Sequence, residues 1–281
     1  MNPVATGSLL ADFSMEMTAK DVAHLDHLRP AVPPGTRINV TYLGNEDPAL
    51  RLEAARAVKR SGFVPVPHIS ARRLDSPRTL TDLLAALQAD GTAESVFVVG
   101  GDPTTPHGPY ADSLTVIRSG LLQRHGVREV GVSGYPEGHP AIADAVLWSV
   151  LAEKVATLGE QGLAGSVITQ FGFAVEPVLS WLLEVRRRGI DLPVRIGVPG
   201  PAGVRRLLRY AARFGVGTSA GIAKKYGLSL TNLMGTAGPG RFLTELERGY
   251  DVRRHGEVKL HFYTFGGLGA TAEWIADFRP T

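Results

Sequence analysis

The chain of 281 residues contains no cysteine. Disulfides, thiolate metal ligands and a cysteine nucleophile are therefore excluded, so any chemistry depends on carboxylates, histidines, hydroxyls or a bound cofactor. The absence of cysteine does not identify a cellular compartment.

Long apolar runs are also missing. The apolar segments, such as SVFVVG at 95–100, are much shorter than the run that a membrane-spanning helix needs. The first residues, MNPVATGSLLADF, lack the basic region and the long apolar core of a secretory signal. We expect a soluble, cytoplasmic protein without a membrane partner.

No strong charge of one sign is present. The formal net charge is +3 and the isoelectric point is about 9.3. The arginines are scattered over 71–75, 184–189 and 203–215, which is typical of solvated helix faces. No run of basic residues is interleaved with stacking aromatic residues, so we expect no nucleic-acid partner.

Short β-rich segments alternate with amphipathic stretches along the whole chain. The eight β-rich segments are 12–17, 37–43, 63–70, 95–101, 129–135, 165–171, 193–200 and 258–265. Strict alternation of strand and helix predicts parallel strands with right-handed crossovers. Eight such units in this length predict an α/β fold, a (β/α)8 TIM barrel that forms a single domain over 1–281.

The amphipathic stretches predict the helices of this fold. In 47–62, 79–91 and 175–189, apolar residues recur three to four positions apart and a glycine closes the stretch. The segment 216–240, rich in Gly, Ser and Thr, predicts extra short helices before the last strand. A doubly wound sheet is the alternative fold, but no G-x-G-x-x-G follows the first strand.

Polar side chains stand where the predicted strands end. In a barrel of this kind the site is built from the C-terminal ends of the strands and the loops after them. The polar residues at these ends are Glu16, Thr41, His68, Asp102, Tyr135, Glu137, His139, Gln170, Tyr263 and Thr264. Their convergence predicts an enzyme or a ligand-binding barrel.

Each of these groups also has a structural interpretation. Glu16 either points to solvent or lies in the barrel mouth, where burial raises the pKa of a carboxyl and favours a proton donor. His68 and Gln170 have the alternative of structural hydrogen bonding, Asp102 of an Asp-Pro turn, and His139 of capping the next helix. No recurrent ligand spacing joins the histidines and carboxylates, so we predict no metal site.

Seven short motifs stand on successive predicted strands. They are FSMEM (13–17), NVTY (39–42), PHIS (67–70), GGDP (100–103), GYPEGHP (134–140), ITQF (168–171) and HFYT (261–264). In this order they resemble the methylenetetrahydrofolate reductase family over residues 11 to 275. The resemblance implies an oxidoreductase of one-carbon metabolism and methionine biosynthesis. Such an enzyme interconverts 5,10-methylenetetrahydrofolate and 5-methyltetrahydrofolate with NADH or NADPH through bound FAD.

The resemblance also implies roles for individual residues. Glu16 would be the acid that helps to protonate folate N10, and Asp102 would support the resulting iminium cation and lie near the flavin. Substrate contacts would come from Gln170, Tyr263 and Phe265, and flavin contacts from Thr41, His68, Gly101, Asp102, Tyr135 and His139, with Lys154 standing in for a phosphate contact.

Three departures from the family pattern leave other functions open. Gly100 stands where the family usually has arginine, 141–162 lacks the usual Asn and Arg, and Phe265-Gly266-Gly267 replaces an Asn-Arg pair. The alternatives are a flavin-independent reductase using direct hydride transfer, a non-catalytic barrel that binds folate or flavin, and a pterin-dependent methyltransferase. Exposed apolar helix faces would favour a homo-oligomer.

Overall fold

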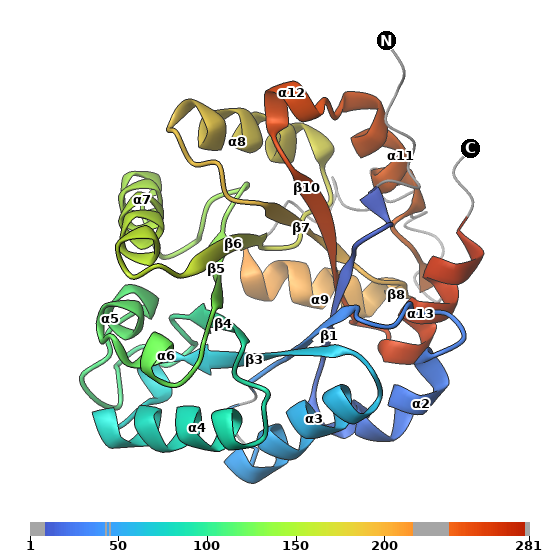
Figure 1. Cartoon of the computed structure of the whole chain (residues 1–281). Coiled ribbons are helices and arrows are strands. Elements are labelled where there is room, and N and C mark those ends of the chain that lie inside the picture. Colours follow the sequence, from blue (N-terminus) through green and yellow to red (C-terminus); the bar gives the residue numbers. More distant parts are fainter. Residues whose placement is uncertain (1–8, 43, 45, 216–235, 279–281) are drawn as a thin grey trace.

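Eight parallel strands form a closed barrel in the computed structural model, which describes residues 9–42, 44, 46–215 and 236–278 (Figure 1). Their order around the barrel is β1-β10-β7-β6-β5-β4-β3-β2. The strands are β1 (Ser14–Met17), β2 (Arg37–Val40), β3 (Val64–Ser70), β4 (Ser95–Val99), β5 (Glu129–Gly134), β6 (Ala164–Thr169), β7 (Val194–Pro199) and β10 (Val258–Tyr263). The predicted α/β TIM barrel is confirmed.

The first and last strands close the barrel by pairing with each other. Ser14 lies opposite His261 and Met15 opposite Phe262, so β1 and β10 are neighbours although they stand at opposite ends of the chain. An open doubly wound sheet would leave both of these edges unpaired, so that alternative is wrong.

Helices surround the barrel and alternate with its strands. They are η1 (Ala19–His24), α2 (Leu25–Leu28), α3 (Pro48–Arg60), η2 (Ala71–Arg73), α4 (Pro77–Ala89), α5 (Ser113–Arg118), α6 (Leu121–Arg124), α7 (Asp144–Glu160), α8 (Val175–Arg187), α9 (Val204–Phe214), α11 (Gly240–Gly249), α12 (Val252–His255) and α13 (Leu268–Asp277). Asp47 caps α3 by accepting a hydrogen bond from the Ala49 amide (2.9 Å), and Ser76 caps α4. Each cap precedes a proline at the first helical position, where the missing N–H costs no helical hydrogen bond.

The two ends of the barrel differ in chemistry. At the N-terminal end, an ion pair joins Arg37 to Glu129 (2.8 Å), and the buried Arg195 donates to the Asp12 carbonyl (3.0 Å). Above them the barrel interior is apolar, filled by Val66, Phe97 and Ile168. Because ion pairs and packed side chains fill these layers, the C-terminal end is left for ligand chemistry.

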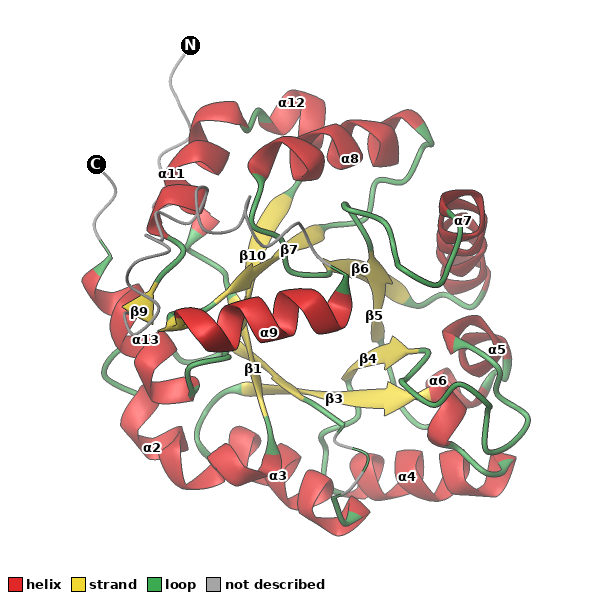
Figure 2. Cartoon of the chain, turned by 180° about the vertical axis from the view of Figure 1, so that it is seen from behind, coloured by secondary structure: helices red, strands yellow, loops and turns green. Residues whose placement is uncertain are grey.

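Helix α9 lies across the C-terminal mouth of the barrel instead of along its side (Figure 2). The Tyr210 ring stacks on Phe265, which follows β10, with ring centroids 4.2 Å apart. At its other end, a methyl group added to Gly215 would stand 3.0 Å from the Pro140 ring in the loop after β5. The segment 203–215 was expected to present a solvated face; its arginines are exposed, but its aromatic face closes the mouth.

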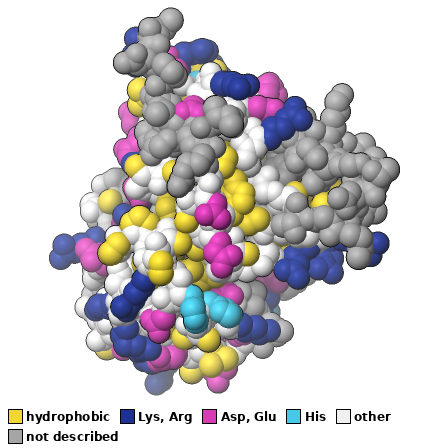
Figure 3. Space-filling model, turned by 90° about the vertical axis from the view of Figure 1, so that its right-hand side faces the viewer, with side chains coloured by type: hydrophobic (Ala, Val, Ile, Leu, Met, Phe, Trp, Pro, Cys, Tyr) yellow, Lys and Arg dark blue, Asp and Glu magenta, His cyan; other side chains and the backbone are white. Residues whose placement is uncertain are grey.

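The predicted extra helices of 216–240 fall mostly outside the described residues. Within that segment, Thr236–Ala237 form β9, which pairs antiparallel with β8 (Ala202–Gly203), and α11 starts at Gly240. Among the described residues, every helix is too short or too polar to cross a bilayer. Basic and acidic side chains are interspersed on the face shown in Figure 3.

Candidate active site

Glu16 lies at the C-terminal end of β1 beside two histidines from other strands. Its side chain is only 17% exposed, and its Oε1 atom lies 3.6 Å from Nε2 of His261 and 3.9 Å from Nε2 of His68. The Thr264 hydroxyl donates to the Glu16 backbone carbonyl (2.8 Å). Strands β1, β3 and β10 thus bring one carboxylate and two imidazoles together at the barrel mouth.

His261 is completely buried and is held by Ser14 on the neighbouring strand. The Nδ1 atom lies 2.8 Å from the Ser14 hydroxyl, which leaves Nε2 facing Glu16. We assign the Ser14 hydroxyl as the donor to Nδ1, because Nε2 then carries the proton and presents it to the carboxylate. Ser14 therefore fixes the orientation of the His261 ring.

His68 is buried on the other side of the carboxylate. The Asn39 amide donates to Nε2 of His68 (3.3 Å), and the edge of the ring meets Phe97. Burial lowers the pKa of His68 to about 4, against the attraction of Glu16. The imidazole is therefore neutral at neutral pH, which agrees with its role as acceptor from Asn39.

Glu16 itself is ionised at neutral pH. Burial raises the pKa of Glu16, but the N–H of His261 and electrostatic attraction to the two imidazoles outweigh it, with a smaller contribution from the Thr41 hydroxyl. The pKa lies below its ordinary value of 4.5 as a result. A largely enclosed anion of this kind stabilises a positive charge that develops next to it.

An aromatic surface adjoins the carboxylate. Phe171, two residues after the end of β6, contacts Tyr263 (ring centroids 5.4 Å apart), Phe265 (4.9 Å) and Phe214 of α9 (5.8 Å). The Tyr263 hydroxyl donates to the Thr169 carbonyl (3.0 Å), and burial raises the pKa of Tyr263 well above 10.0. Tyr263 and Phe265 are only partly buried, and flat rings beside a carboxylate suit a planar, hydrogen-bonding ligand such as a pterin or a flavin.

The loop after β5 faces this surface through Tyr135. Burial raises the pKa of Tyr135, and its ring meets the His139 ring edge-on (5.3 Å). His139 accepts a hydrogen bond at Nδ1 from the Ala141 amide (3.1 Å), and so it braces its own loop while α7 starts further on. Gln170 accepts at Oε1 from the Phe171 amide (3.1 Å).

Asp102 and Gly101 lie at the rim. The Asp102 side chain is 63% exposed and forms an ion pair with Arg73 (2.6 Å). Partial burial raises the pKa of Asp102, but the hydrogen bond from Arg73 outweighs it and the pKa falls below 3.8. Gly101 has φ +93° and stands against the Ser70 hydroxyl, so only glycine fits there. In this arrangement the charge of Asp102 is neutralised by Arg73.

Lys154 is the predicted residue that the structure does not bring to the mouth. It is buried ten residues into α7, about 15 Å along the helix axis from its first turn. Burial lowers the pKa of Lys154, and Asp112, the N-cap residue of α5, opposes that effect. Its ammonium group is enclosed between two outer helices.

Of the residues predicted from the sequence, Glu16, Thr41, His68 and Tyr263 come together, and Tyr135, Gln170 and Phe265 adjoin them. His261 and Asn39 were not predicted. The alternation of side chains along a strand could have revealed them, because residues two apart point to the same face of the sheet. His261 precedes Tyr263 by two residues, and Asn39 precedes Thr41 by two. Within the described ranges, no three His, Asp or Glu side chains are grouped as metal ligands would be.

Comparison with known proteins adds little to this geometry. No protein-family model matches the chain. Among solved structures, the chain is similar to dihydropteroate synthase from Thermus thermophilus, with 15% sequence identity and a TM-score of 0.48 over 94% of this chain and 91% of that chain. A likeness this weak carries no argument about function.

Proposed function

We propose that the protein reduces 5,10-methylenetetrahydrofolate to 5-methyltetrahydrofolate, with NADH or NADPH as the hydride donor. The observation that carries this proposal is the ionised, largely enclosed carboxylate of Glu16 beside the aromatic surface of Phe171, Tyr263 and Phe265. The ordered motifs that resemble methylenetetrahydrofolate reductases support the same reaction.

The reaction needs one proton and one hydride. The bond between N10 and the methylene carbon breaks, N10 takes the proton, and a cation with a double bond between N5 and the methylene carbon is left. The hydride from the nicotinamide ring adds to that carbon, which gives the N5-methyl group and NAD(P)⁺. An anion beside the cation lowers the barrier because it stabilises charge that exists only after the ring opens.

Glu16 can first supply the proton and then, as an anion, stabilise the cation. A bound pterin ring removes the remaining solvent from the carboxylate, and this raises the pKa of Glu16 so that it takes up a proton from water. It passes the proton to N10 and, as an anion again, faces the iminium cation. His261, oriented by Ser14, places its Nε2 atom 3.6 Å from the carboxylate and so faces it across the mouth.

The aromatic face of α9 keeps water from the cation. An iminium ion reacts with water, so the mouth must be closed while the hydride is transferred. Tyr210 and Phe214 of α9 cover Phe265 and Phe171.

Bound FAD stays a prediction. Residues for its ring, Thr41, His68 and Tyr135, surround the mouth, but Lys154 lies too far along α7 to reach a phosphate there. The described residues do not fit the phosphates at that place, and no step above passes through a flavin. The position of Lys154 and the closure of the mouth by α9 favour the second candidate, direct hydride transfer from the nicotinamide.

The visible spectrum of the purified protein separates these two candidates. A flavin band that bleaches when NADH is added without oxygen supports the FAD route. Turnover with NADH in protein that has no band, even after incubation with FAD, supports direct transfer.

Substitution of Glu16 tests the reaction itself. Glu16→Gln keeps the shape of the side chain but removes its charge and its proton, so we expect kcat to fall by about 10²–10³ while folate binding persists. Glu94→Gln, at an exposed glutamate before β4, is the matched control and should keep full turnover. Equal turnover in the two variants would overturn the role of Glu16. A wild-type protein that binds folate without any change in NAD(P)H would support the non-catalytic or methyltransferase alternative.

A further inference from the structure

A cavity of about 650 Å³ lies beside the mouth, between α9 and α13. It opens where the loops after β7 and β10 leave the barrel, and Gly203 and Gly266 of these loops line it. The N-cap residues of α9 and α13 are Gly203 and Gly267, and neither provides a side-chain cap. Two helix N-termini therefore start at this cavity with backbone N–H groups that no side chain caps.

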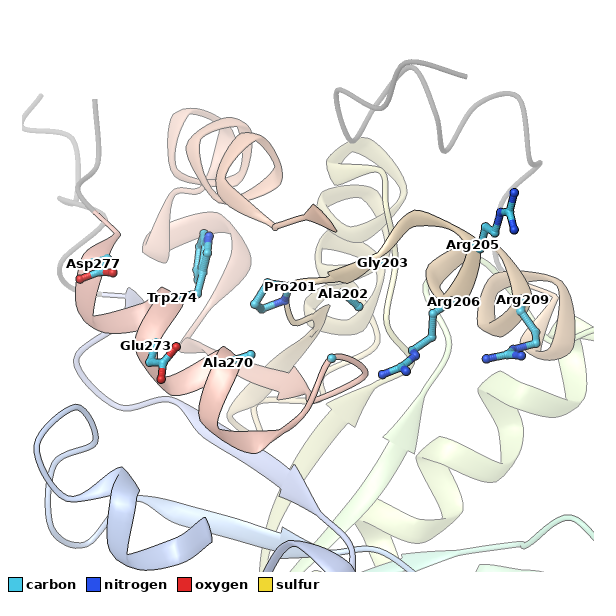
Figure 4. A pocket seen from close by; sticks show the side chains of 11 residues that line it. Pro201, Ala202, Gly203, Arg205, Arg206, Arg209, Ala270, Glu273, Trp274 and Asp277 are labelled. Atoms are coloured by element: carbon cyan, nitrogen blue, oxygen red, sulfur yellow. The ribbon is translucent and has the colours of Figure 1, made fainter. Parts of the chain in front are cut away.

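Arginines form one wall of the cavity. Arg205, Arg206 and Arg209 all come from α9, and Figure 4 shows Arg206 and Arg209 together at one end. Arg206 donates to the Phe265 carbonyl (2.9 Å), which fixes its position. None of the three pairs with a carboxylate in the part of the chain that the structure describes. This wall presents positive charge that is free to meet an anion.

The opposite wall carries two carboxylates and an indole. Glu273, Trp274 and Asp277 of α13 line it, and Figure 4 shows them away from the arginines, beyond Pro201. Trp274 stacks on Phe278 (4.7 Å), and its remaining surface lines the cavity. The cavity is therefore polarised, with cations at one end and hydrogen-bond acceptors beside a flat ring at the other.

We propose that this cavity binds the adenosine diphosphate group of a dinucleotide. The phosphates meet Arg206, Arg209 and the two helix N-termini, which offer both charge and N–H donors. The ribose hydroxyls donate to Glu273 or Asp277, and the adenine lies against Trp274. The glutamate tail of a folate fits less well, because its carboxylates would meet those of α13.

The position of the cavity suits the proposed reaction, on which this assignment of the nucleotide rests. Gly266 lines the cavity, Phe265 belongs to the aromatic surface, and Thr264 bonds the Glu16 carbonyl. Three consecutive residues thus join the two sites, and a dinucleotide held here directs its other half to the mouth. NADH, NADPH and FAD all carry the adenosine diphosphate group, so the chemistry of the cavity is common to them.

Titration of the full chain with ADP, followed by calorimetry, tests the proposal without any turnover. The wild type should bind ADP, and Arg209→Ala should weaken binding about tenfold or more, since a charge-assisted hydrogen bond is lost. Arg78→Ala, at an exposed arginine of α4, is the matched control and should bind as the wild type does. No binding by the wild type, or equal binding by Arg209→Ala, would overturn the proposal, and so would preference for triglutamate over ADP.

Two further measurements identify which molecule brings the adenosine diphosphate group to the cavity. If the nicotinamide cofactor occupies the cavity, Arg209→Ala raises the KM for NADH and leaves FAD binding unchanged; if FAD occupies it, the reverse holds. Unchanged values for both, with turnover intact, overturn the cavity assignment and leave the reductase proposal standing. ADP binding that Arg209→Ala weakens, in a protein without reductase turnover, supports the cavity and contradicts the reductase.

Discussion

The neutral, buried His68 makes the stability of the fold depend on pH. The pKa of His68 is about 4 in the folded chain and has an ordinary value of 6.5. Below pH 6.5 His68 is therefore protonated in the unfolded chain but not in the folded chain, and the free energy of unfolding falls as the pH falls. The decrease ends below pH 4, where His68 is protonated in both states. The difference of about 2.5 pH units, at about 1.4 kcal/mol for each, makes the full effect roughly 3 kcal/mol.

Urea unfolding of wild type and His68→Gln at about pH 7.5 and about pH 5 measures this effect. Because of His68, the free energy of unfolding of the wild type should fall by about 2 kcal/mol from the higher to the lower pH. The variant should not show this decrease. Glu16 adds little in this window, because its pKa lies below 4.5. The quantity to compare between wild type and variant is the change in the free energy of unfolding between the two pH values. The cost of the substitution and the contributions of the other histidines then cancel.

His27→Gln, on the exposed side of α2, is the control for the loss of a surface histidine. It should retain the wild-type dependence on pH. If wild type and His68→Gln lose the same free energy between the two pH values, then His68 is protonated in the folded chain. The neutral acceptor described beside Asn39 and Glu16 would then be wrong.

Two substitutions test the packing that supports the site. Ser14→Ala leaves Nδ1 of the buried His261 without its partner, and the free energy of unfolding, measured in urea, should fall by about 1–3 kcal/mol. Gly197→Ala drives a methyl group into the Thr169 carbonyl oxygen, closer than van der Waals contact allows, and thermal unfolding should show a loss of about 1–3 kcal/mol or more. Gly159→Ala, on α7 with open space around it, should instead stabilise the chain by up to about 1 kcal/mol, and a loss as large as that of Gly197→Ala would contradict the steric argument.

The strands and the main helices could be predicted because their signals are local. An apolar run such as 95–100 and a stretch with apolar residues three to four apart each report their own structure. The predicted segments 47–62 and 175–189 became α3 and α8 with ends shifted by at most two residues. Alternation along the chain then selected the barrel, because parallel strands need crossovers.

The site could be predicted only as far as strand ends reveal it. Glu16 and His68 met because parallel strands bring their C-terminal ends to one edge. The partners that set their charge were not visible, because the pairing of Asn39 with His68 and of Ser14 with His261 depends on the register of neighbouring strands. The pairing of Asp102 with Arg73 depends likewise on how η2 follows β3 and how the loop after β4 turns.

Helix α9 shows the limit of a pattern read along one segment. Its alternation of arginines and apolar residues predicts one solvent-exposed face and one buried face, and the structure has both. The pattern does not say what the buried face covers: it is the mouth of the barrel, through Tyr210. The neighbouring Arg209 points about 100° away around the helix axis and lines the cavity. Since the two residues are rigidly joined, any movement of α9 changes the aromatic cover of the mouth and the cationic wall of the cavity at the same time.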